Sequence, residues 1–347
     1  MRNIKVSVII PVYNAGKHLP QCLNSLIEQS LREIEILCIN DGSSDNSLKI
    51  LREYALKDPR ITVLEQSNHG AGTARNAGLS KARGKYLSFL DSDDYFKPTM
   101  LEESYKYAED QKADIIIFDV WRIDDATGNE MLSDWIIRRD FLPKQKIFSV
   151  NDIPDKIFNF SHNVVWNKLF RRDFIAKNNL KFQEVPHTND TLFMCRALLM
   201  AQRISVLDKK LLFYRNNLKL SLTSRSVRQK HPLCIYSVLS AIQQESINSG
   251  MYDKIEKSFA NLALSQLIFN LYSTNGRAFR ILYRNIRYKW SDEFGISGHD
   301  RDYFYFKSDY DHYLDLKDTA YCVYILKSSL GLSFRRNRCV AQVSSEL

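Results

Sequence analysis

The first 120 residues alternate between short apolar runs and segments with apolar residues at helical spacing. The apolar runs are rich in Val, Ile and Leu and stop at polar turns, which predicts buried strands. These runs cover residues 5–12, 33–39, 61–64, 86–90 and 114–120. The segments between them predict helices at residues 19–27, 47–56, 72–82 and 99–110. Strands that alternate with helices over short connections predict a mainly parallel sheet with helices on both faces.

The pattern turns helical from Arg228 onward, with long periodic stretches at residues 233–247 and 255–272. We therefore expect an α/β domain at residues 1–225, followed by a mostly helical C-terminal region at residues 226–347. The second region is the part expected to contact a membrane or a partner.

One segment of the C-terminal region, residues 277–290, predicts a basic amphipathic helix. Its two faces carry Arg277, Arg280, Arg284 and Arg287 on one side, and Phe279, Leu282, Tyr283, Ile286 and Trp290 on the other. Such a helix can lie in a membrane interface, where anionic lipids contribute about 1 kcal/mol per basic residue. Alternatively, its apolar face packs on the domain and its arginines are solvated. Both interpretations remain open at this stage.

Composition is typical of a globular chain, with 44% apolar and 26% charged residues. No apolar run approaches the length of about 18 residues that a membrane span needs, and the N-terminus leads directly into a strand. The cysteines are scattered without a C-x-x-C pair, which favours a reducing compartment over a disulfide framework or a zinc site. We expect a cytoplasmic protein, placed peripherally on the inner face of the plasma membrane if the basic helix binds lipid.

Charge is distributed unevenly along the chain. Residues 1–136 hold 16 basic against 21 acidic side chains, whereas residues 137–347 hold 33 against 19. The basic second part favours an anionic partner, such as a membrane surface or a phosphate-containing molecule. Nucleic acid is disfavoured because the basic residues form no recognisable nucleic-acid-binding module.

Polar clusters follow three of the predicted strands, at residues 11–14, 40–43 and 91–94. Ligands of open parallel sheets gather at the carboxyl ends of the strands, so these clusters predict a single polar site. The glycine-containing stretch at residues 69–76 matches neither G-x-G-x-x-G nor G-x-x-x-x-G-K-[ST]. A nicotinamide-dependent Rossmann enzyme and a P-loop ATPase are therefore both disfavoured.

The third cluster, Asp91-Ser92-Asp93-Asp94, places three carboxylates within four residues. Like charges this close repel one another unless a cation lies among them. Hard oxygen ligands suit Mg²⁺ or Mn²⁺, and Mg²⁺ in proteins is often shared between one or two carboxylates and substrate phosphates. The alternative is a solvated cap of the next helix, since Asp94 is followed by residues that resemble a helix lead-in, Tyr95 to Pro98.

Four segments together give a resemblance to a known family. VSVIIPVYNAGKHLPQCLNSLIEQS, INDGSSDNS, NHGAGTARNAGL and FLDSDDYF resemble, in order and spacing, glycosyltransferase family 2, whose members have the GT-A fold. A weaker match, WNKLF followed by NDTLF, extends the resemblance to about residue 225. It implies a nucleotide-sugar-binding part at residues 1–120 and an acceptor-side part at residues 121–225.

The resemblance also implies roles for individual residues. The nucleotide-binding set comprises Pro11, Tyr13, Asn14, Asp41, Arg75, Asn76, Asp91 and Ser92. Within it, the turn at Pro11 and Tyr13 lines the base, and Asp41 accepts a hydrogen bond from uracil. Asp93 ligates the metal, Mn²⁺ or Mg²⁺. The family's Glu-Asp-x-x-Phe segment reads Asn189-Asp190-Thr191-Leu192-Phe193 here, so Asp190 keeps the position of the catalytic base while the Glu is absent.

Four further residues are candidates for contacts with the donor sugar or the acceptor: Trp166, Lys168, Asn189 and Arg215. The flat ring of Trp166 suits the apolar face of a sugar, although a tryptophan in this position also suits a core. Arg215 suits bidentate contact with phosphate, or alternatively closes a strand at the surface.

We therefore expect a metal-dependent inverting glycosyltransferase that moves a sugar from a nucleotide-sugar donor to a hydroxyl of a glycan or lipid-linked acceptor in surface polysaccharide biosynthesis. The resemblance favours a UDP-linked donor. Two alternatives remain. A sugar nucleotidyltransferase shares the fold, but its Gly-rich basic loop is poorly matched by residues 13–17. A catalytically inactive binding or scaffold subunit is favoured only by the missing Glu.

Overall fold

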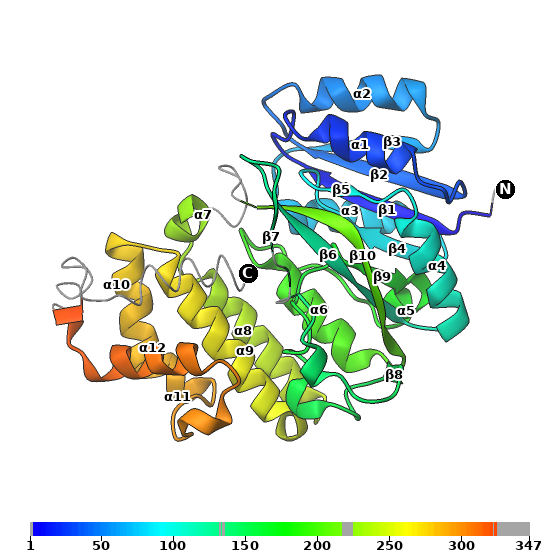
Figure 1. Ribbon diagram of the computed structural model, residues 1–347. Helices are drawn as coiled ribbons and strands as arrows, with labels where there is room; N and C mark the ends of the chain where they lie inside the picture. Colours follow the sequence, from blue (N-terminus) through cyan, green and yellow to red (C-terminus); the bar gives the residue numbers. More distant parts are fainter. Residues whose placement is uncertain (1–2, 132, 134–135, 217–224, 322, 325–347) are drawn as a thin grey trace.

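The computed structural model describes residues 3–131, 133, 136–216, 225–321 and 323–324, with the side chains of 225 and 226 excepted. It consists of an α/β part that contains one sheet, and a helical part that lies beside it (Figure 1). The predicted α/β fold class with a helical C-terminal extension is confirmed. Residues 325–347 of the expected C-terminal region lie outside the described residues.

The sheet runs in the order β3-β2-β1-β4-β9-β6-β10-β5, with β7 paired to β6 and β8 to β10. The pairs β3/β2, β2/β1, β1/β4 and β6/β10 are parallel, whereas β9 runs antiparallel between β4 and β6. The strands are β1 Val6–Val12, β2 Ile34–Asp41, β3 Ile61–Gln66, β4 Tyr86–Phe89, β5 Tyr95–Phe96, β6 Ile115–Asp124, β7 Glu130–Met131, β8 Ile147–Phe148, β9 Lys168–Arg171 and β10 Ile204–Asn216.

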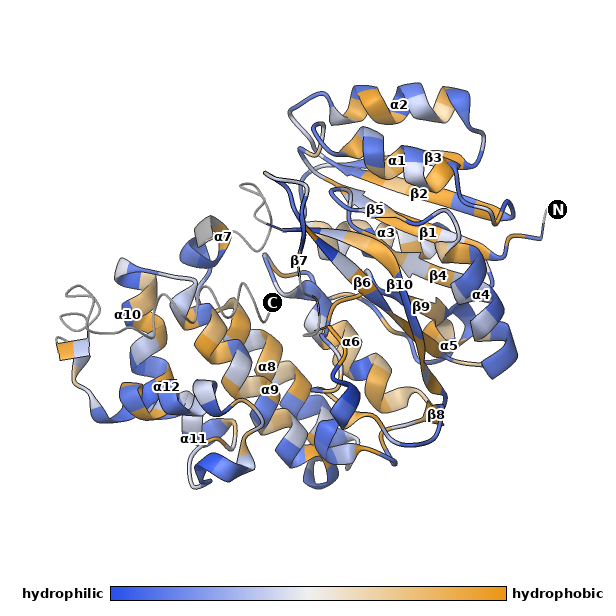
Figure 2. Ribbon diagram, in the orientation of Figure 1, coloured by the Kyte–Doolittle hydropathy of each residue, from blue (hydrophilic) through white to orange (hydrophobic). Residues whose placement is uncertain are grey.

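The first four helices of the α/β part begin and end close to the positions that the apolar periodicity predicts, and two more follow them. They are α1 Leu19–Ile27, α2 Ser47–Lys57, α3 Ala71–Lys81, α4 Met100–Gln111, α5 Arg172–Lys177 and α6 Asn189–Met200. Short 3₁₀ turns lie at Arg139–Phe141 and Pro154–Lys156. Figure 2 shows apolar residues along the central strands and mixed polar and apolar residues on the helices, and the apolar residues of both form one buried core.

The helical part contains α7 Arg225–Lys230, α8 Cys234–Asn248, α9 Tyr252–Tyr272, α10 Gly276–Asn285, α11 Ser291–Glu293 and α12 Lys307–Asp318. A π-helical turn, Ile286–Trp290, continues α10, and a 3₁₀ turn lies at Arg301–Tyr303. Helix α9 is buried along most of its length and also packs on the 3₁₀ turn at residues 154–156. The helical part thus shares its core with the α/β part (Figure 1).

The basic segment at residues 277–290 is helical, as predicted, and its apolar face packs inside the protein. Phe279, Leu282, Tyr283, Ile286 and Trp290 are all buried, and α10 contacts α9. Arg277, Arg280 and Arg284 are exposed. The structure therefore favours the second interpretation of this helix, because an apolar face that is already packed cannot insert into a lipid interface.

None of the helices in the described part of the chain combines the length and the apolarity that crossing a bilayer requires.

Candidate active site

The predicted carboxylate cluster forms a compact group at the end of β4. Asp91, Asp93 and Asp94 each offer a carboxylate oxygen, and these oxygens all lie within 4.8 Å of one another. The cluster follows directly on buried Leu90, at the carboxyl end of a strand in the middle of the sheet. The sheet therefore holds three acidic groups together at a fixed place, which is the arrangement that a hard divalent cation requires.

Burial and mutual repulsion make ionisation of the cluster unfavourable without a counter-charge. Desolvation and the charge of Asp91 raise the pKa of Asp93 to about 7. Desolvation, followed by the charges of Asp93 and Asp91, also raises the pKa of Asp94 well above its ordinary value. A cation among the three would reverse both shifts, because it stabilises the ionised form.

Asp94 does not belong to a helix lead-in, which corrects that alternative. Its Oδ1 accepts a hydrogen bond from the backbone N–H of Arg215, 2.9 Å away, and Tyr95–Phe96 form the short strand β5, which pairs with β10. Its Oδ2 is buried without a hydrogen-bond partner among the described residues. A buried carboxylate oxygen without a partner is costly, so this atom fits a cation or a water of its coordination shell.

The side chain of Arg215 is largely buried and already paired, which corrects the alternative of a surface arginine. Its Nη1 donates to Oδ1 of Asp125 at 2.9 Å, its Nη2 donates to Oε1 of Gln21, and its guanidinium lies 5.0 Å from the ring centroid of Tyr95. The charge of Arg215 lowers the pKa values of Asp93 and Asp94, so it lies beside the carboxylate cluster. Direct contact of Arg215 with phosphate would need this pairing to rearrange.

Asp41, at the end of β2, holds the loop that leads into α3. Its Oδ1 accepts hydrogen bonds from Nε2 of Gln66 (2.7 Å) and the backbone N–H of His69 (2.9 Å). Its Oδ2 accepts from the backbone N–H of Gly70 at 2.8 Å. The predicted contact with uracil stays a prediction, and the structure adds a loop-anchoring role to it.

The turn after β1 is fixed by Asn14, which has a left-handed backbone with φ 49°. Its Oδ1 accepts a hydrogen bond from the backbone N–H of Ser44 at 2.8 Å, and its own N–H donates to Oγ of Ser43 at 3.1 Å. Pro11 lies in β1 opposite Ile39, and Tyr13 is 50% exposed. Asn14 thus joins the first two polar clusters, and the exposed ring of Tyr13 is accessible to a ligand.

Arg75, on α3, connects the carboxylate cluster to the segment that contains Asp190. Its Nη2 donates to Oδ1 of Asp91 at 2.6 Å, and its Nη1 donates to Oδ1 of Asn189 at 2.7 Å. Arg75 is buried, and both hydrogen bonds come from the two terminal nitrogens of its planar guanidinium group. The substitution of Asn for the family's Glu at position 189 therefore keeps an acceptor oxygen for Arg75 and removes one negative charge.

Asn76, the next residue of α3, hydrogen-bonds the backbone of Phe182 through its side-chain amide. Its Nδ2 donates to the carbonyl of Phe182 at 3.0 Å, and its Oδ1 accepts from the N–H of Phe182 at 2.9 Å. A Cβ at Gly72 would lie 2.5 Å from the carbonyl oxygen of Gln183, so α3 and this segment approach closely there. The amide of Asn76 thus holds residues 182–183 against α3, and its expected contact with the nucleotide stays a prediction.

Replacing Arg75 by lysine tests the connection between the two halves of the site. A single ammonium cannot reproduce the two-pronged contact with Asp91 and Asn189, so we expect kcat to fall about 10-fold or more. Steady-state kinetics and a melting curve measure this. Arg52→Lys is the matched control, because Arg52 is exposed and forms a surface ion pair with Glu65. Equal kcat values for both variants would contradict the positioning role.

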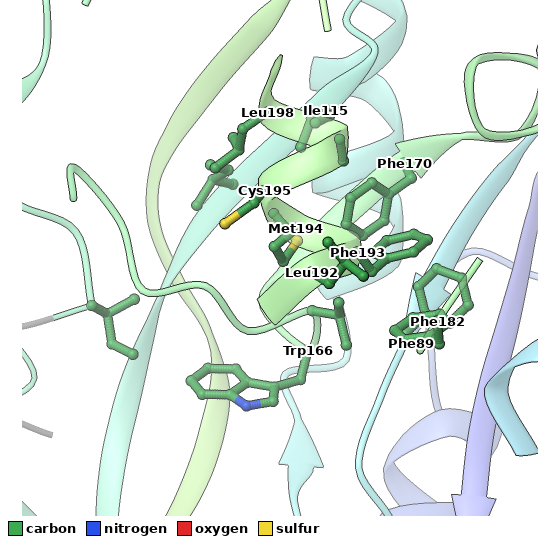
Figure 3. Close-up of a cluster of buried hydrophobic side chains, with 14 of the residues drawn as sticks. Phe89, Ile115, Trp166, Phe170, Phe182, Leu192, Phe193, Met194, Cys195 and Leu198 are labelled. Atoms are coloured by element: carbon green, nitrogen blue, oxygen red, sulfur yellow. The ribbon is translucent and has the colours of Figure 1, made fainter. Parts of the chain in front are cut away.

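Asp190 lies in the first turn of α6, and an aromatic cluster fixes this helix (Figure 3). The ring of Phe193 stacks on Phe182 with centroids 4.2 Å apart and meets Phe89 and Phe170 edge-on at 5.6 and 5.5 Å. Because Phe193 lies three residues after Asp190 on the same helix, the packing of the cluster fixes the position of the Asp190 carboxylate. This packing gives a physical reason for an aromatic residue at the end of the Asn-Asp-x-x-Phe segment.

The pKa of Asp190 is raised above its ordinary value of 3.8, chiefly by burial. The charge of Arg75 opposes this shift, the charge of Asp91 adds to it, and Lys168 opposes it. A carboxylate with a raised pKa is a better proton acceptor near neutral pH. The site thus contains a carboxylate suited to accept a proton, under the influence of the charges of Arg75 and Asp91.

Trp166 and Lys168 are both buried. Trp166 is 5% exposed and stacks on Tyr214 with centroids 5.0 Å apart, and its place near α6 is visible in Figure 3. Nζ of Lys168 donates to the carbonyl of His162 (2.9 Å) and to Oδ1 of Asn167 (2.8 Å). Burial lowers the pKa of Lys168 to about 7. This arrangement favours the core interpretation of Trp166 over contact with a sugar face.

Sequence reasoning missed two buried arginines near the site. Arg122 on β6 is 1% exposed, and Arg228 on α7 is 6% exposed. The charge of Asp190 raises the pKa of Arg228 against the larger effect of burial, so the two side chains interact. For Arg122, the available sequence signal was a charged residue within the apolar run of β6. The position of Arg228 near Asp190 depends on how the helical part packs against the α/β part, which the sequence does not reveal.

Comparisons with known proteins agree with this geometry. The model of the family described as Glycosyl transferase family 2 matches residues 7–178. The chain is 33% identical over 292 residues to the putative glycosyltransferase EpsH of Bacillus subtilis, covering 83% of this chain and 82% of EpsH. The crystal structure of Staphylococcus aureus TarS in complex with UDP-GlcNAc is similar over 90% of this chain and 92% of that one, with TM-score 0.64 and 21% identity. The structure of a mannosyltransferase from Pyrobaculum calidifontis in complex with GDP-Man and Mn²⁺ is similar over 90% of this chain and 86% of that one, with TM-score 0.50 and 15% identity.

Proposed function

The chain belongs to glycosyltransferase family 2, and we propose that it is an inverting, metal-dependent enzyme that uses a UDP-linked sugar. The proposed acceptor is a hydroxyl of a glycan or lipid-linked molecule in surface polysaccharide biosynthesis. The observation that carries the proposal is the connection of Asp91 to Asn189 by Arg75, which sets the carboxylate cluster beside the carboxylate of Asp190. The similar TarS structure is a complex with UDP-GlcNAc, which supports the choice of nucleotide.

The donor half of the proposal uses the polar ends of β1, β2 and β4. Exposed Tyr13 is available to stack on the base, and the backbone around Asp41 and Asn14 fixes the turn beside it. Asp91, Asp93 and Asp94 would hold the divalent cation, with the buried Oδ2 of Asp94 fitting its coordination shell. When bound, the cation supplies positive charge that neutralises the departing diphosphate without a proton.

The acceptor half of the proposal uses Asp190. Its carboxylate takes the proton of the acceptor hydroxyl as the hydroxyl oxygen attacks the anomeric carbon. One carbon–oxygen bond forms on the face opposite the diphosphate, and the bond from the anomeric carbon to the diphosphate breaks with its electron pair on the leaving group. The proton ends on Asp190, the sugar on the acceptor, and the nucleotide leaves as UDP. One such displacement inverts the anomeric configuration.

Peripheral contact with an anionic membrane at the inner face of the plasma membrane is part of the same proposal. The exposed arginines Arg277, Arg280 and Arg284 on α10 support it, because they offer charge to lipid headgroups without requiring insertion. The mode differs from the interfacial helix considered from the sequence, since the apolar face of α10 is packed.

A catalytically inactive scaffold is disfavoured by the contacts of Asn189. The missing Glu was the feature that favoured a scaffold. Asn189, which stands in its place, accepts a hydrogen bond from Arg75. Asp190, the base in this proposal, is present at the start of α6.

The direct test is the release of UDP from a panel of UDP-sugars with Mn²⁺. We expect at least one UDP-sugar to be turned over, and turnover to stop when a chelator removes the metal. Coupled detection of UDP measures the rate, and the matched control is the same panel with GDP-linked sugars. Release that is undiminished by chelator would contradict metal dependence, and the absence of release from every UDP-sugar, with GDP-sugars active, would contradict the nucleotide.

A further inference from the structure

The segment that leads into α6 contains a residue with an unusual backbone conformation. Thr188, which directly precedes the helix, lies in the left-handed region with φ 60° and ψ 25°. A β-branched residue rarely adopts this conformation, because its side chain crowds the backbone there. Such a conformation persists only where the surrounding contacts fix it, and residues of this kind cluster at functional sites. Thr188 lies two residues before Asp190, so its conformation sets how α6 begins.

The ring of His187 makes a hydrogen bond on each side. His187 is 2% exposed, its Nδ1 lies 2.7 Å from Oγ1 of Thr188, and its Nε2 lies 3.1 Å from the carbonyl oxygen of His231. A carbonyl oxygen can only accept a hydrogen bond, so Nε2 is the donor. Burial lowers the pKa of His187 to about 4, so the ring is neutral near pH 7. In a neutral ring with hydrogen on Nε2, Nδ1 accepts from the hydroxyl of Thr188.

The helical part of the chain holds His187 at two places. His231 lies just before α8, and Cys234 is the first residue of that helix. Sγ of Cys234 donates to the carbonyl oxygen of His187 at 3.2 Å, in addition to the contact of the ring with His231. Both the side chain and the backbone of His187 are thus bonded to the start of α8.

A second contact joins α6 to α8 farther along both helices. Nε and Nη2 of Arg196 donate to the two carboxylate oxygens of Glu245. These side chains are 31% and 33% exposed, so the ion pair lies toward the surface. Arg196 lies more than one helical turn after Asp190. This ion pair therefore docks the two helices at a distance from the proposed base.

The residue after Thr188 is held from the opposite direction. Oδ1 of Asn189 accepts a hydrogen bond from Arg75 at 2.7 Å, and Arg75 also contacts Asp91 of the carboxylate cluster. His187 is thus bonded to the helical part, and Asn189 is bonded to the donor side. Asp190 follows both, so its carboxylate takes its position from two separate parts of the protein.

We propose that His187 and Thr188 are positioning residues for the carboxylate of Asp190, and that the start of α8 acts on the base through their hydrogen bonds. The inference rests on the proposed function, because it takes Asp190 as the base. Neither residue takes part in the proton transfer. The helical part of the chain then contributes to catalysis by fixing the beginning of α6, in addition to sharing a core with the α/β part.

Two substitutions at Thr188 test the proposal. Thr188→Val removes the hydroxyl and keeps the branched shape, whereas Thr188→Ser keeps the hydroxyl. We expect kcat to fall about 10-fold or more in Thr188→Val, because a small displacement of a reacting group is costly. In Thr188→Ser, kcat should stay within about two-fold of the wild type, and UDP affinity with Mn²⁺ should stay within about two-fold in both variants. The assays use the full chain and a UDP-sugar that the wild type turns over.

His187→Leu breaks the same chain of hydrogen bonds from its other member. We expect a loss of kcat at least as large as in Thr188→Val, again with little change in UDP affinity. Adding Thr188→Val to His187→Leu should lower kcat no further, because the hydroxyl has already lost its acceptor. Melting curves check that each variant is folded at the assay temperature. If His187→Leu does not fold, the comparison of Thr188→Val with Thr188→Ser decides alone.

Arg196→Gln is the control for docking alone. It removes the ion pair with Glu245 and leaves His187 and Thr188 unchanged. We expect its melting temperature to fall while kcat stays within about two-fold of the wild type.

The inference is overturned if Thr188→Val keeps the wild-type kcat, or if Thr188→Ser loses as much activity as Thr188→Val. It is also overturned if Arg196→Gln lowers kcat as strongly as Thr188→Val, since docking of the helices would then explain the loss. A wild type that releases UDP from no UDP-sugar, or Asp190→Asn at the wild-type rate, contradicts the proposed function instead. An inactive Asp190→Asn beside a fully active Thr188→Val retains the proposed base and removes this positioning role.

Discussion

Replacing Asp190 by asparagine is expected to lower kcat by about 10²- to 10⁴-fold, because the amide cannot take the proton of the acceptor hydroxyl. The substitution preserves size, and α6 remains anchored by Phe193 in its aromatic cluster. UDP affinity should therefore change less than about two-fold. Product formation in steady state and UDP titration measure the two quantities separately.

The pH dependence of the same reaction provides a second measurement on Asp190. The base works only as the carboxylate, so kcat/KM falls as pH is lowered through its pKa. Burial raises that pKa above its ordinary value, so the acidic limb should lie at a higher pH than the titration of an exposed aspartate. In Asp190→Asn the residual activity should lose this limb.

Asp173→Asn is the matched control for the base, since Asp173 is an exposed carboxylate on α5. Its kcat and pH profile should equal those of the wild type. A wild-type rate in Asp190→Asn, or an acidic limb unchanged by the substitution, would show that another group takes the proton.

Replacing Asp93 by asparagine is expected to weaken metal-dependent UDP binding by at least about 100-fold and to abolish turnover. Even partners that only orient a metal ligand cost 10- to 100-fold in affinity, so removal of a ligand charge should cost no less. Titrations of UDP at several Mn²⁺ concentrations measure the effect. Asp208→Asn, which changes an exposed carboxylate paired with Arg139, is the control and should bind as the wild type does.

The same variant should be more stable than the wild type when metal is absent. Oxygens of Asp91, Asp93 and Asp94 lie within 4.8 Å of one another, so removing one charge relieves repulsion. We expect the melting temperature of metal-free Asp93→Asn to rise by roughly a few degrees, while the increase that Mn²⁺ gives the wild type disappears. A lower melting temperature without metal would mean that Asp93 supports the fold, and loss of activity would then not report on metal.

Most elements of the first 120 residues were predictable because the strands are mostly buried and apolar, and α1, α2 and α4 carry apolar residues at helical spacing. The runs at residues 5–12 and 33–39 correspond to β1 and β2 with boundaries shifted by one or two residues. Strand β5 was not predictable, because two residues, Tyr95 and Phe96, carry no periodicity and pair with a strand more than 100 positions away.

The contacts within the candidate site were harder to predict from the sequence, because they join segments that are far apart along the chain. Arg75 and Asn189 are separated by 114 positions, and Asn76 and Phe182 by 106. The sequence motif that contains Arg75 and Asn76 predicts that both residues lie near the site. It does not predict which residue each side chain hydrogen-bonds. The docking of α7 and α8 beside His187, which positions Arg228, likewise depends on tertiary packing.

The most direct test of the central claim is the electron paramagnetic resonance signal of free Mn²⁺ during titration with the protein and UDP. If the carboxylates after β4 hold a cation against the diphosphate, the protein with UDP should remove about one Mn²⁺ per chain from solution, and Asp93→Asn should leave the signal unchanged. The account would be contradicted if the variant sequestered Mn²⁺ as the wild type does, or if UDP bound equally well to both proteins without any metal.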